Sequence, residues 1–360
     1  MNPSIVAIGT AVPPTRLAQH DVREVFATQP GIGRLTQRLV HAAFDASAIE
    51  YRHTVLSGLL GDPGDGLSVR HGDVLLSPPT SARNAEYRRL VPALFAEASR
   101  QALSDAGLDA AAVTHVITVS CTGLFAPGPD MRLVRDLGLS PNVERYHHGF
   151  VGCAAAVPAL RAAHRIAVAQ PGSVVLVASA ELCSLHLRAS SDPEQIVAAS
   201  LFADGAAAAI VTSAPSTGVR LELDTFATAL TSDGEDDMTW TIGDEGFEMR
   251  LSAEVPRIVG REVRAAASDL LDVDAWAVHP GGRSVLDRVA AGLELTDAQM
   301  APSREVLRDY GNMSSATILF ILRRLLHDDS LGDADIGALA FGPGLTVESA
   351  RLHRRTAAGA

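Results

Sequence analysis

Three mainly apolar runs of strand length constrain the fold of this chain more than any other feature. The runs span residues 113–120, 173–180 and 206–213, and none alternates with polar residues as a half-exposed strand does. Strands buried on both faces belong to sheets that helices cover on both sides. Helical patterns at about 130–137 and 154–170 separate the runs. This order predicts an α/β fold.

A second pattern of strands and helices begins beyond residue 214. It repeats the alternation of the first half and predicts a coarse duplication, with domains at 1–215 and 216–360. The expected elements of the second half are extended segments at 219–230 and 238–252, helices from 253 and at 284–293, 303–310 and 313–327, and strands at 275–279 and around 341–345. In the first half we also expect a strand at 4–10, an irregular segment at 57–79 and a long helix at 81–106 that Ser81 caps.

Composition argues against several classes of protein. The formal net charge of -12 disfavours nucleic acid or an anionic membrane as a partner. No apolar run reaches membrane-spanning length, and the N-terminus lacks the basic region of a signal peptide. Three widely spaced cysteines indicate neither a disulfide framework nor a zinc site. We therefore expect a cytoplasmic protein without a metal.

Cys153 is the candidate nucleophile. It follows Gly152 where a predicted strand turns into a helix, and Ala154 leaves room beside the sulfur. Backbone amides and the positive end of the helix are expected to favour the thiolate there. A free cysteine is more often a small buried hydrophobic residue, so the assignment requires a catalytic partner.

Two later segments supply candidate partners. His279 ends a predicted strand and precedes Pro280-Gly-Gly, which places its imidazole at the edge of the sheet where α/β active sites lie. Asn312 precedes Met313-Ser-Ser at the start of a helix. Taken singly, His279 could be a capping or core residue and Asn312 an ordinary helix cap.

Taken together and in order, these segments resemble the type III polyketide synthases, the chalcone and stilbene synthase-like family of the thiolase fold. The resemblance extends to Leu201-Phe-Ala-Asp-Gly and Phe341-Gly-Pro-Gly and covers nearly the whole chain, least clearly residues 1–80. It implies a five-layer αβαβα fold made of two similar halves. It also implies a homodimer in which Ala126 contributes to the neighbour's cavity.

The resemblance implies a decarboxylative acyltransferase. Cys153 would accept the acyl group of a CoA starter, with His279 as its ion-pair partner and Asn312 as a second donor. Acyl transfer requires a thiolate beside an imidazolium, and the enolate formed from malonyl-CoA requires fixed donors such as these two side chains. The reaction needs no metal or cofactor. A cysteine protease would use Asn to orient His instead, and a non-catalytic protein of the same fold is favoured only if one of the three residues is lost.

The family pattern also places a set of side chains around the substrate cavity. These residues are Cys121, Thr122, Cys183, His186, Phe202, Trp240, Met249 and Ser314. Phe202 matches a gatekeeping phenylalanine, Met249 replaces a second one of the plant enzymes, and Trp240 stands where chalcone synthases have glycine. We expect a medium- or long-chain aliphatic acyl-CoA starter and an alkylpyrone or alkylresorcinol product.

Other outcomes stay open. A synthase that uses malonyl-CoA alone would make tetrahydroxynaphthalene, phloroglucinol or a dihydroxyphenylacetyl product. An enzyme like ketoacyl synthase III would stop after one condensation. For the CoA phosphates, the candidate ligands are Arg34, Arg38 and Arg52 of the N-terminal region.

Overall fold

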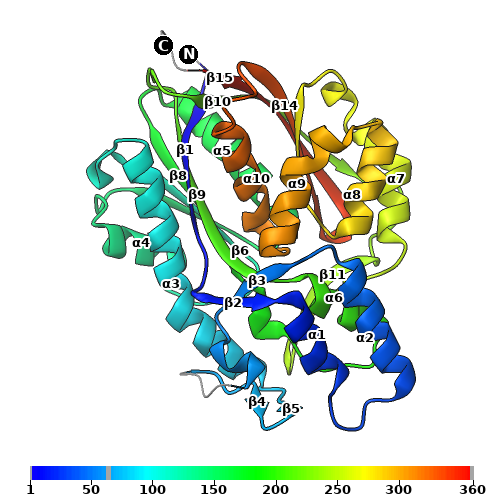
Figure 1. Ribbon diagram of the computed structural model, residues 1–360. Coiled ribbons are helices and arrows are strands. Elements are labelled where there is room, and N and C mark those ends of the chain that lie inside the picture. Colours follow the sequence, from blue (N-terminus) through cyan, green and yellow to red (C-terminus); the bar gives the residue numbers. More distant parts are fainter. Residues whose placement is uncertain (1, 62–65, 357–360) are drawn as a thin grey trace.

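The computed structural model describes residues 2–61 and 66–356 and confirms the α/β prediction. Its main sheet has nine strands in the order β13-β14-β15-β10-β1-β9-β8-β6-β7. The two halves of this sheet meet where β1 (Ser4–Ala11) pairs with β10 (Arg220–Leu230) over only two residue pairs. Each half therefore forms a sheet of its own, joined to the other at one short contact (Figure 1).

The first sheet contains the three apolar runs at residues 113–120, 173–180 and 206–213. They form β6 (His115–Ser120), β8 (Val174–Leu182) and β9 (Asp204–Thr212), and β7 (Glu144–Gly149) is the edge strand. β6 is parallel to β7 and β8, whereas β9 is antiparallel to β8 and β1. Successive side chains point to opposite faces, so each apolar run contributes to two separate cores.

The second sheet is formed by β10 with three later strands. These are β13 (Ala275–Val278), β14 (Ala334–Gly342) and β15 (Thr346–Arg355). β13 and β14 are parallel, and β15 is antiparallel to both β14 and β10.

Helices lie between the two sheets and outside each of them (Figure 1). α5 (Ala156–Ala169) and α10 (Thr317–Leu326) fill the space between the sheets, and residues of both halves form this central core. α3 (Thr80–Asp105) and α4 (Pro129–Leu137) cover the outer face of the first sheet. α7 (Val255–Ala266) and α8 (Arg283–Leu293) cover that of the second. These are the five layers that the resemblance implied.

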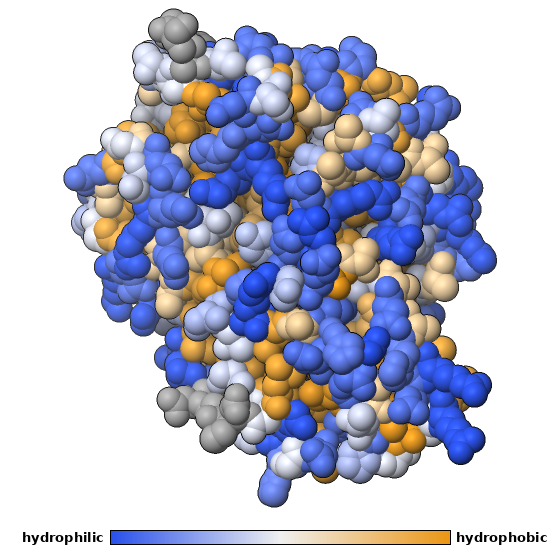
Figure 2. All heavy atoms as spheres, in the orientation of Figure 1, coloured by the Kyte–Doolittle hydropathy of each residue, from blue (hydrophilic) through white to orange (hydrophobic). Residues whose placement is uncertain are grey.

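A group of shorter elements covers one end of the layered core (Figure 1). Its members are β2 (Thr15–Ala18), α1 (Gln19–Ala27), α2 (Arg34–Ala46), β3 (Tyr51–Thr54), α6 (Pro193–Leu201), β11 (Met238–Gly243) and β12 (Gly246–Leu251). Hydrophilic residues cover most of the face shown in Figure 2, with hydrophobic residues in smaller groups among them. This is the distribution expected where each surface helix buries one apolar side.

Several expected boundaries differ from the observed ones. Pro79 precedes α3 and no side chain caps it, so Ser81 is not the cap. α9 (Asp297–Tyr310) begins earlier than predicted because Thr296 and Gln299 form a capping box. The expected helix at 313–327 opens as a separate turn, Ser314–Ala316. The irregular segment 57–79 contains the short strands β4 (Arg70–His71) and β5 (Val74–Leu75), and its residues 62–65 lie outside the described part.

Candidate active site

The turn that carries Cys153 leads from β7 into α5, as predicted. Phe150 and Gly152 adopt left-handed φ angles of 57° and 75° in this turn. A Cβ atom added at Gly152 would lie 2.1 Å from Cδ of Pro343, so a side chain does not fit there. Two independent reasons therefore require glycine at position 152, namely its left-handed backbone angle and the close contact with Pro343.

A second cysteine holds the same turn from the end of β6. The backbone N–H of Gly152 donates to Sγ of Cys121 at 3.1 Å. The N–H of Cys121 and the hydroxyl of Thr122 donate in turn to Oε2 of Glu181, at 2.9 and 2.8 Å. The sequence analysis assigned no role to Glu181, although a single carboxylate in an apolar strand is a signal that something must satisfy it.

Asn312 points its amide nitrogen toward Cys153. Its Oδ1 accepts the N–H of Ser314 at 2.8 Å, which leaves the NH₂ group on the opposite side of the amide. A hydrogen bond from this side chain lowers the pKa of Cys153. The local turn that would explain Asn312 as a cap therefore also orients its donor toward the sulfur.

The Cys153 thiol is neutral in this structure. Burial raises its pKa to about 11, and the charge of Glu181 acts in the same direction, against the hydrogen bonds from Ser314 and Asn312. The sulfur lies 3.5 Å from Oγ of Ser314. The expectation that the helix end would favour the thiolate is therefore wrong for this structure, because desolvation of the buried charge outweighs it.

His279 is fully buried at the end of β13. Its backbone N–H donates to the carbonyl of Leu339 at 2.8 Å, whereas neither ring nitrogen has a hydrogen-bond partner among the described residues. Burial lowers the pKa of the imidazole to about 3. The expected ion pair with Cys153 is thus not formed here, and two unsatisfied ring nitrogens are a feature that a functional role would explain.

The turn after His279 and the chain at Asn312 both lie against Leu201. A Cβ at Gly282 would lie 3.4 Å from the Leu201 side chain, and the backbone N–H of Asn312 donates to the Leu201 carbonyl at 3.0 Å. Residue 201 ends α6, so this helix joins the two candidate partners of Cys153.

An inner cavity of about 20 Å³ adjoins Cys153. Seven of the eight predicted pocket residues line it. They are Cys121, Thr122, Cys183, Phe202, Trp240, Met249 and Ser314. The eighth, His186, lines a neighbouring middle cavity of about 30 Å³, which shares Cys183, Phe202, Trp240 and Met249 with the first.

Hydrogen bonds fix the aromatic wall of these two cavities. Trp240 donates its indole N–H to the carbonyl of Cys121 at 2.7 Å. His186 accepts the N–H of Phe247 at Nδ1, 2.9 Å away, so its Nε2 carries the proton and donates to the Thr122 carbonyl at 2.8 Å. Burial lowers the pKa of His186 to about 4, and its ring stacks on Phe247 at 4.3 Å. The wall is therefore rigid.

An outer cavity of about 1180 Å³ leads toward the inner ones. It lies among the C-terminal end of α2, α6, β12 and the N-terminal ends of α7 and α8. Gln195 and Met249 line both the outer and the middle cavity, and Gln195 donates to the Met249 carbonyl at 2.7 Å. Met249 lines all three cavities and stands between the large space and Cys153.

The three arginines predicted for CoA do not lie at this cavity. Arg34 and Arg38 are exposed on α2, and neither is among its lining residues in the part of the chain that the structure describes. Arg52 is only 1% exposed. All three of its guanidinium nitrogens donate, to the Gln19 side chain and to the carbonyls of Ala199, Ser200 and Phe202. The prediction for Arg52 is therefore wrong, because its donors are already used.

The described residues contain no group of three or more His, Cys, Asp or Glu side chains arranged to hold a metal ion. Within the same ranges, no helix combines the length and apolar character needed to cross a membrane.

Comparison with known families identifies relatives of both halves. Residues 2–215 match the family described as chalcone and stilbene synthases, N-terminal domain, and residues 222–355 match the C-terminal domain. Type III polyketide synthase 21 of Oryza sativa subsp. japonica is 34% identical over 96% of this chain and 92% of its own length. The 3,5-dihydroxyphenylacetyl-CoA synthase of Streptomyces toyocaensis is 32% identical over 97% of this chain and 89% of its own.

Two further similarities involve Dictyostelium. Probable polyketide synthase 1 of Dictyostelium discoideum is 30% identical over 98% of this chain, which spans only 11% of that much longer protein. Among solved structures, the C-terminal type III polyketide synthase domain of a type I/III hybrid from Dictyostelium superposes with a TM-score of 0.90 at 29% identity. That match covers 98% of this chain and 99% of the domain.

Proposed function

We propose that Cys153, His279 and Asn312 perform the condensation chemistry of this enzyme. The chain belongs to the chalcone and stilbene synthase family and is a type III polyketide synthase, an acyltransferase. The observation that carries this proposal is the pair of unsatisfied, fully buried ring nitrogens of His279, together with an Asn312 amide oriented toward a buried thiol. Donors held in this way in a site closed to water stabilise developing negative charge.

Loading begins with transfer of the Cys153 proton to His279. The thiolate attacks the thioester carbon of the acyl-CoA, and the CoA thiolate leaves with the proton that His279 carries. Because burial disfavours both charged forms, we propose that the proton moves from Cys153 to His279 during loading and does not reside on His279 beforehand.

Extension uses the same side chains without a proton from Cys153. Malonyl-CoA loses CO₂, and the N–H groups of His279 and Asn312 donate to the enolate oxygen that results. The enolate carbon attacks the carbonyl carbon of the Cys153 thioester, and the Cys153 thiolate is released. The extended chain is then attached to the CoA of the extender unit. Return of that chain to Cys153 allows the next round.

The inner cavity favours a short starter over the aliphatic one that the sequence analysis preferred. About 10–15 Å³ of such space holds one water molecule, so about 20 Å³ beside Cys153 leaves no room for a long alkyl chain. Trp240 blocks extension of the space, and its hydrogen bond to Cys121 holds it there. We therefore propose an acetyl or malonyl starter, in keeping with the dihydroxyphenylacetyl product named for the Streptomyces relative.

Growth of the chain requires a wall that can move. Met249 has a flexible, unbranched side chain and lines the inner, middle and outer cavities. Its displacement would join the three spaces, so the lengthening polyketide would extend toward the outer cavity.

Labelled malonyl-CoA with a panel of starters from acetyl-CoA to stearoyl-CoA tests the reaction, with products analysed by mass. If no starter gives a labelled polyketide, the assignment of activity fails. More than one extender unit per product distinguishes the chain from an enzyme like ketoacyl synthase III. Cys153→Ala should abolish the acyl adduct, whereas the matched variant Cys183→Ala, in the same cavity, should retain it.

Two variants at one position test the starter proposal separately. Trp240→Ala should admit longer acyl groups because it empties the blocking volume. Trp240→Phe loses the hydrogen bond to the Cys121 carbonyl but keeps most of the ring volume. This variant should therefore still prefer short starters. If the unaltered enzyme extends palmitoyl-CoA as readily as acetyl-CoA, the short-starter proposal is refuted and the synthase assignment stands.

A second copy of the chain is the proposed partner along β7. This strand ends the sheet, and its edge lacks a neighbouring strand in the described part. Tyr146 lies on β7, Val151 follows it and Leu124 follows the neighbouring β6, and these side chains are 44%, 39% and 43% exposed, as expected for an interface between copies. Sedimentation equilibrium tests this: a dimer that Tyr146→Glu weakens supports it, and a monomer at micromolar concentration contradicts it.

A further inference from the structure

Four arginines line the outer cavity, and the condensation chemistry uses none of them. They are Arg250 on β12, Arg257 on α7, and Arg283 and Arg288 on α8. All four belong to the C-terminal half of the chain, whereas the three arginines predicted for CoA belong to the N-terminal region. They lie in the largest of the three cavities, so the entrance of the path to Cys153 carries their positive charge.

The acidic residues on the α6 side of this cavity already have polar partners. Glu248 pairs with Arg188 at 3.1 Å, outside the cavity. Asp192 accepts the N–H of Glu194 at 2.8 Å, at the start of α6. Glu194 lies 3.5 Å from Arg250. Arginines thus pair with Glu248 and Glu194, whereas Asp192 keeps its charge as the cap of α6, and Arg250 is already occupied.

The α8 side keeps free positive charge. Asp287 has its closest partner in Arg304 at 2.8 Å and lies 3.6 Å from Arg283. Arg288 is exposed and has no ion pair or hydrogen bond with any residue in the described ranges. Arg257 is held by Glu254 at 2.7 Å. Arg283 and Arg288 are therefore the two guanidinium groups best able to accept a new anionic partner.

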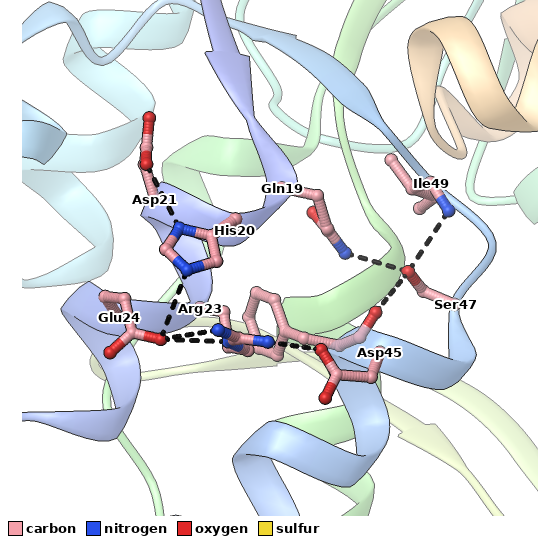
Figure 3. A network of polar contacts seen from close by, with 9 residues as sticks. Gln19, His20, Asp21, Arg23, Glu24, Asp45, Ser47 and Ile49 are labelled. Carbon is pink, nitrogen blue, oxygen red and sulfur yellow. Dashed lines mark hydrogen bonds and ion pairs between the residues drawn. The ribbon is translucent and has the colours of Figure 1, made fainter.

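Among the described residues, the wall formed by the end of α2 contributes no arginine to the cavity lining. Figure 3 shows how α1 fastens the end of α2: Gln19 donates to Ser47 at 2.9 Å, and Arg23 lies between Glu24 and Asp45. Ser47 lines the cavity, but Arg23 is occupied by its two carboxylates. The free charge at the entrance thus comes from α8.

We propose that Arg283 and Arg288 bind the phosphate groups of the CoA substrates, an inference that rests on the proposed function for the identity of the ligand. Guanidinium groups bind phosphate oxygens through paired N–H donors. Pockets for drug-sized ligands span about 300–1,000 Å³, and the outer cavity, at about 1180 Å³, accommodates a larger ligand such as a nucleotide with its pantetheine arm. The phosphates lie at the arginines while the thioester passes Met249 toward Cys153.

Steady-state kinetics with two malonyl donors test this assignment. Arg283→Gln and Arg288→Gln should each raise KM for malonyl-CoA about tenfold, the loss expected for one charged hydrogen-bonded contact. KM for malonyl-N-acetylcysteamine, which lacks the nucleotide and all phosphates, should not change, and neither should kcat with either donor. Arg34→Gln and Arg38→Gln are matched controls on α2 and should behave like the unaltered enzyme.

Three results would overturn the inference. One is an unchanged KM for malonyl-CoA in both α8 variants, and another is a rise in the α2 variants instead. The third is an equal rise for both donors, which would indicate a structural defect rather than a lost phosphate contact. Calorimetric titration with CoA alone measures binding without turnover, so the arginines can be tested even if the proposed reaction fails. Titration with 3′-dephospho-CoA then shows whether the 3′-phosphate or the diphosphate is held.

Discussion

The turn that carries Cys153 should not tolerate any side chain at position 152. Gly152 has a φ angle of 75°, and an added Cβ would lie 2.1 Å from Cδ and 2.8 Å from Cγ of Pro343. Pro343 is a rigid ring that cannot rotate away. Gly152→Ala must therefore move either the proline or the turn itself.

Two terms contribute to the expected loss of stability. A left-handed backbone costs alanine about 1–2 kcal/mol. Forcing a methyl group into a packed site costs about 1–3 kcal/mol more, so Gly152→Ala should lose about 2–5 kcal/mol. Gly344 isolates the first term, because its φ angle is 70° and an added Cβ meets no atom within 4 Å. Gly344→Ala should lose only the backbone cost.

The two variants are compared by urea unfolding and by turnover of malonyl-CoA. A displacement of the sulfur by about 1 Å costs on the order of 100-fold in rate. We expect such a fall in kcat for Gly152→Ala, together with slower alkylation of Cys153. If Gly152→Ala is as stable as Gly344→Ala and keeps the kcat of the unaltered enzyme, the packing of the turn against Pro343 does not hold the nucleophile.

Three further predictions concern the buried polar groups of the site. Burial raises the pKa of Cys153 from 9.0 to about 11, so alkylation of the free enzyme by iodoacetamide should accelerate between pH 9 and 11. The stability that this neutral thiol contributes should be complete below pH 9 and lost as the pH passes 11. An alkylation rate that levels off below pH 8 would instead show a preformed ion pair. Cys121→Ala leaves the Gly152 N–H without its acceptor and should cost about 1–3 kcal/mol, whereas Cys121→Ser, which keeps an acceptor, should cost less in thermal unfolding. Arg52→Lys retains the charge but not the planar set of donors, so it should destabilise the fold by about 3 kcal/mol or more. It should leave KM for malonyl-CoA unchanged. A rise in KM without a fall in stability would show that Arg52 does bind CoA.

Much of the fold follows from the sequence because its signals are local. Apolar runs without alternation define β6, β8 and β9 as strands buried on both faces, and the structure splits each run between two cores. The turn at Gly152 is equally local, since glycine followed by small residues permits only a few backbone paths. Errors arose at helix ends, where a capping box or an unrecognised turn shifts a boundary by a few residues.

The cavity walls depend on segments far apart in the chain. Trp240 on β11 reaches the carbonyl of Cys121 at the end of β6, and Met249 on β12 reaches all three cavities. The resemblance to the family placed these side chains in the pocket, but the volume that remains between them is a small difference between large packed volumes. Only the packed structure could show that about 20 Å³ is left beside the nucleophile.

The sequence by itself indicated the buried strands, many of the helices, the turn of Cys153 and the order of its candidate partners along the chain, because each of these signals depends on neighbouring residues. Only the tertiary structure decided the charge of the thiol and the use of the arginines. Cys153 is neutral because its surroundings exclude water, and Glu181 adds to this effect. Arg52 is enclosed by the carbonyls of Ala199, Ser200 and Phe202, whereas Arg288 is exposed at the outer cavity. Burial and ion pairing arise from contacts between remote segments, so identical residue types acquire different roles.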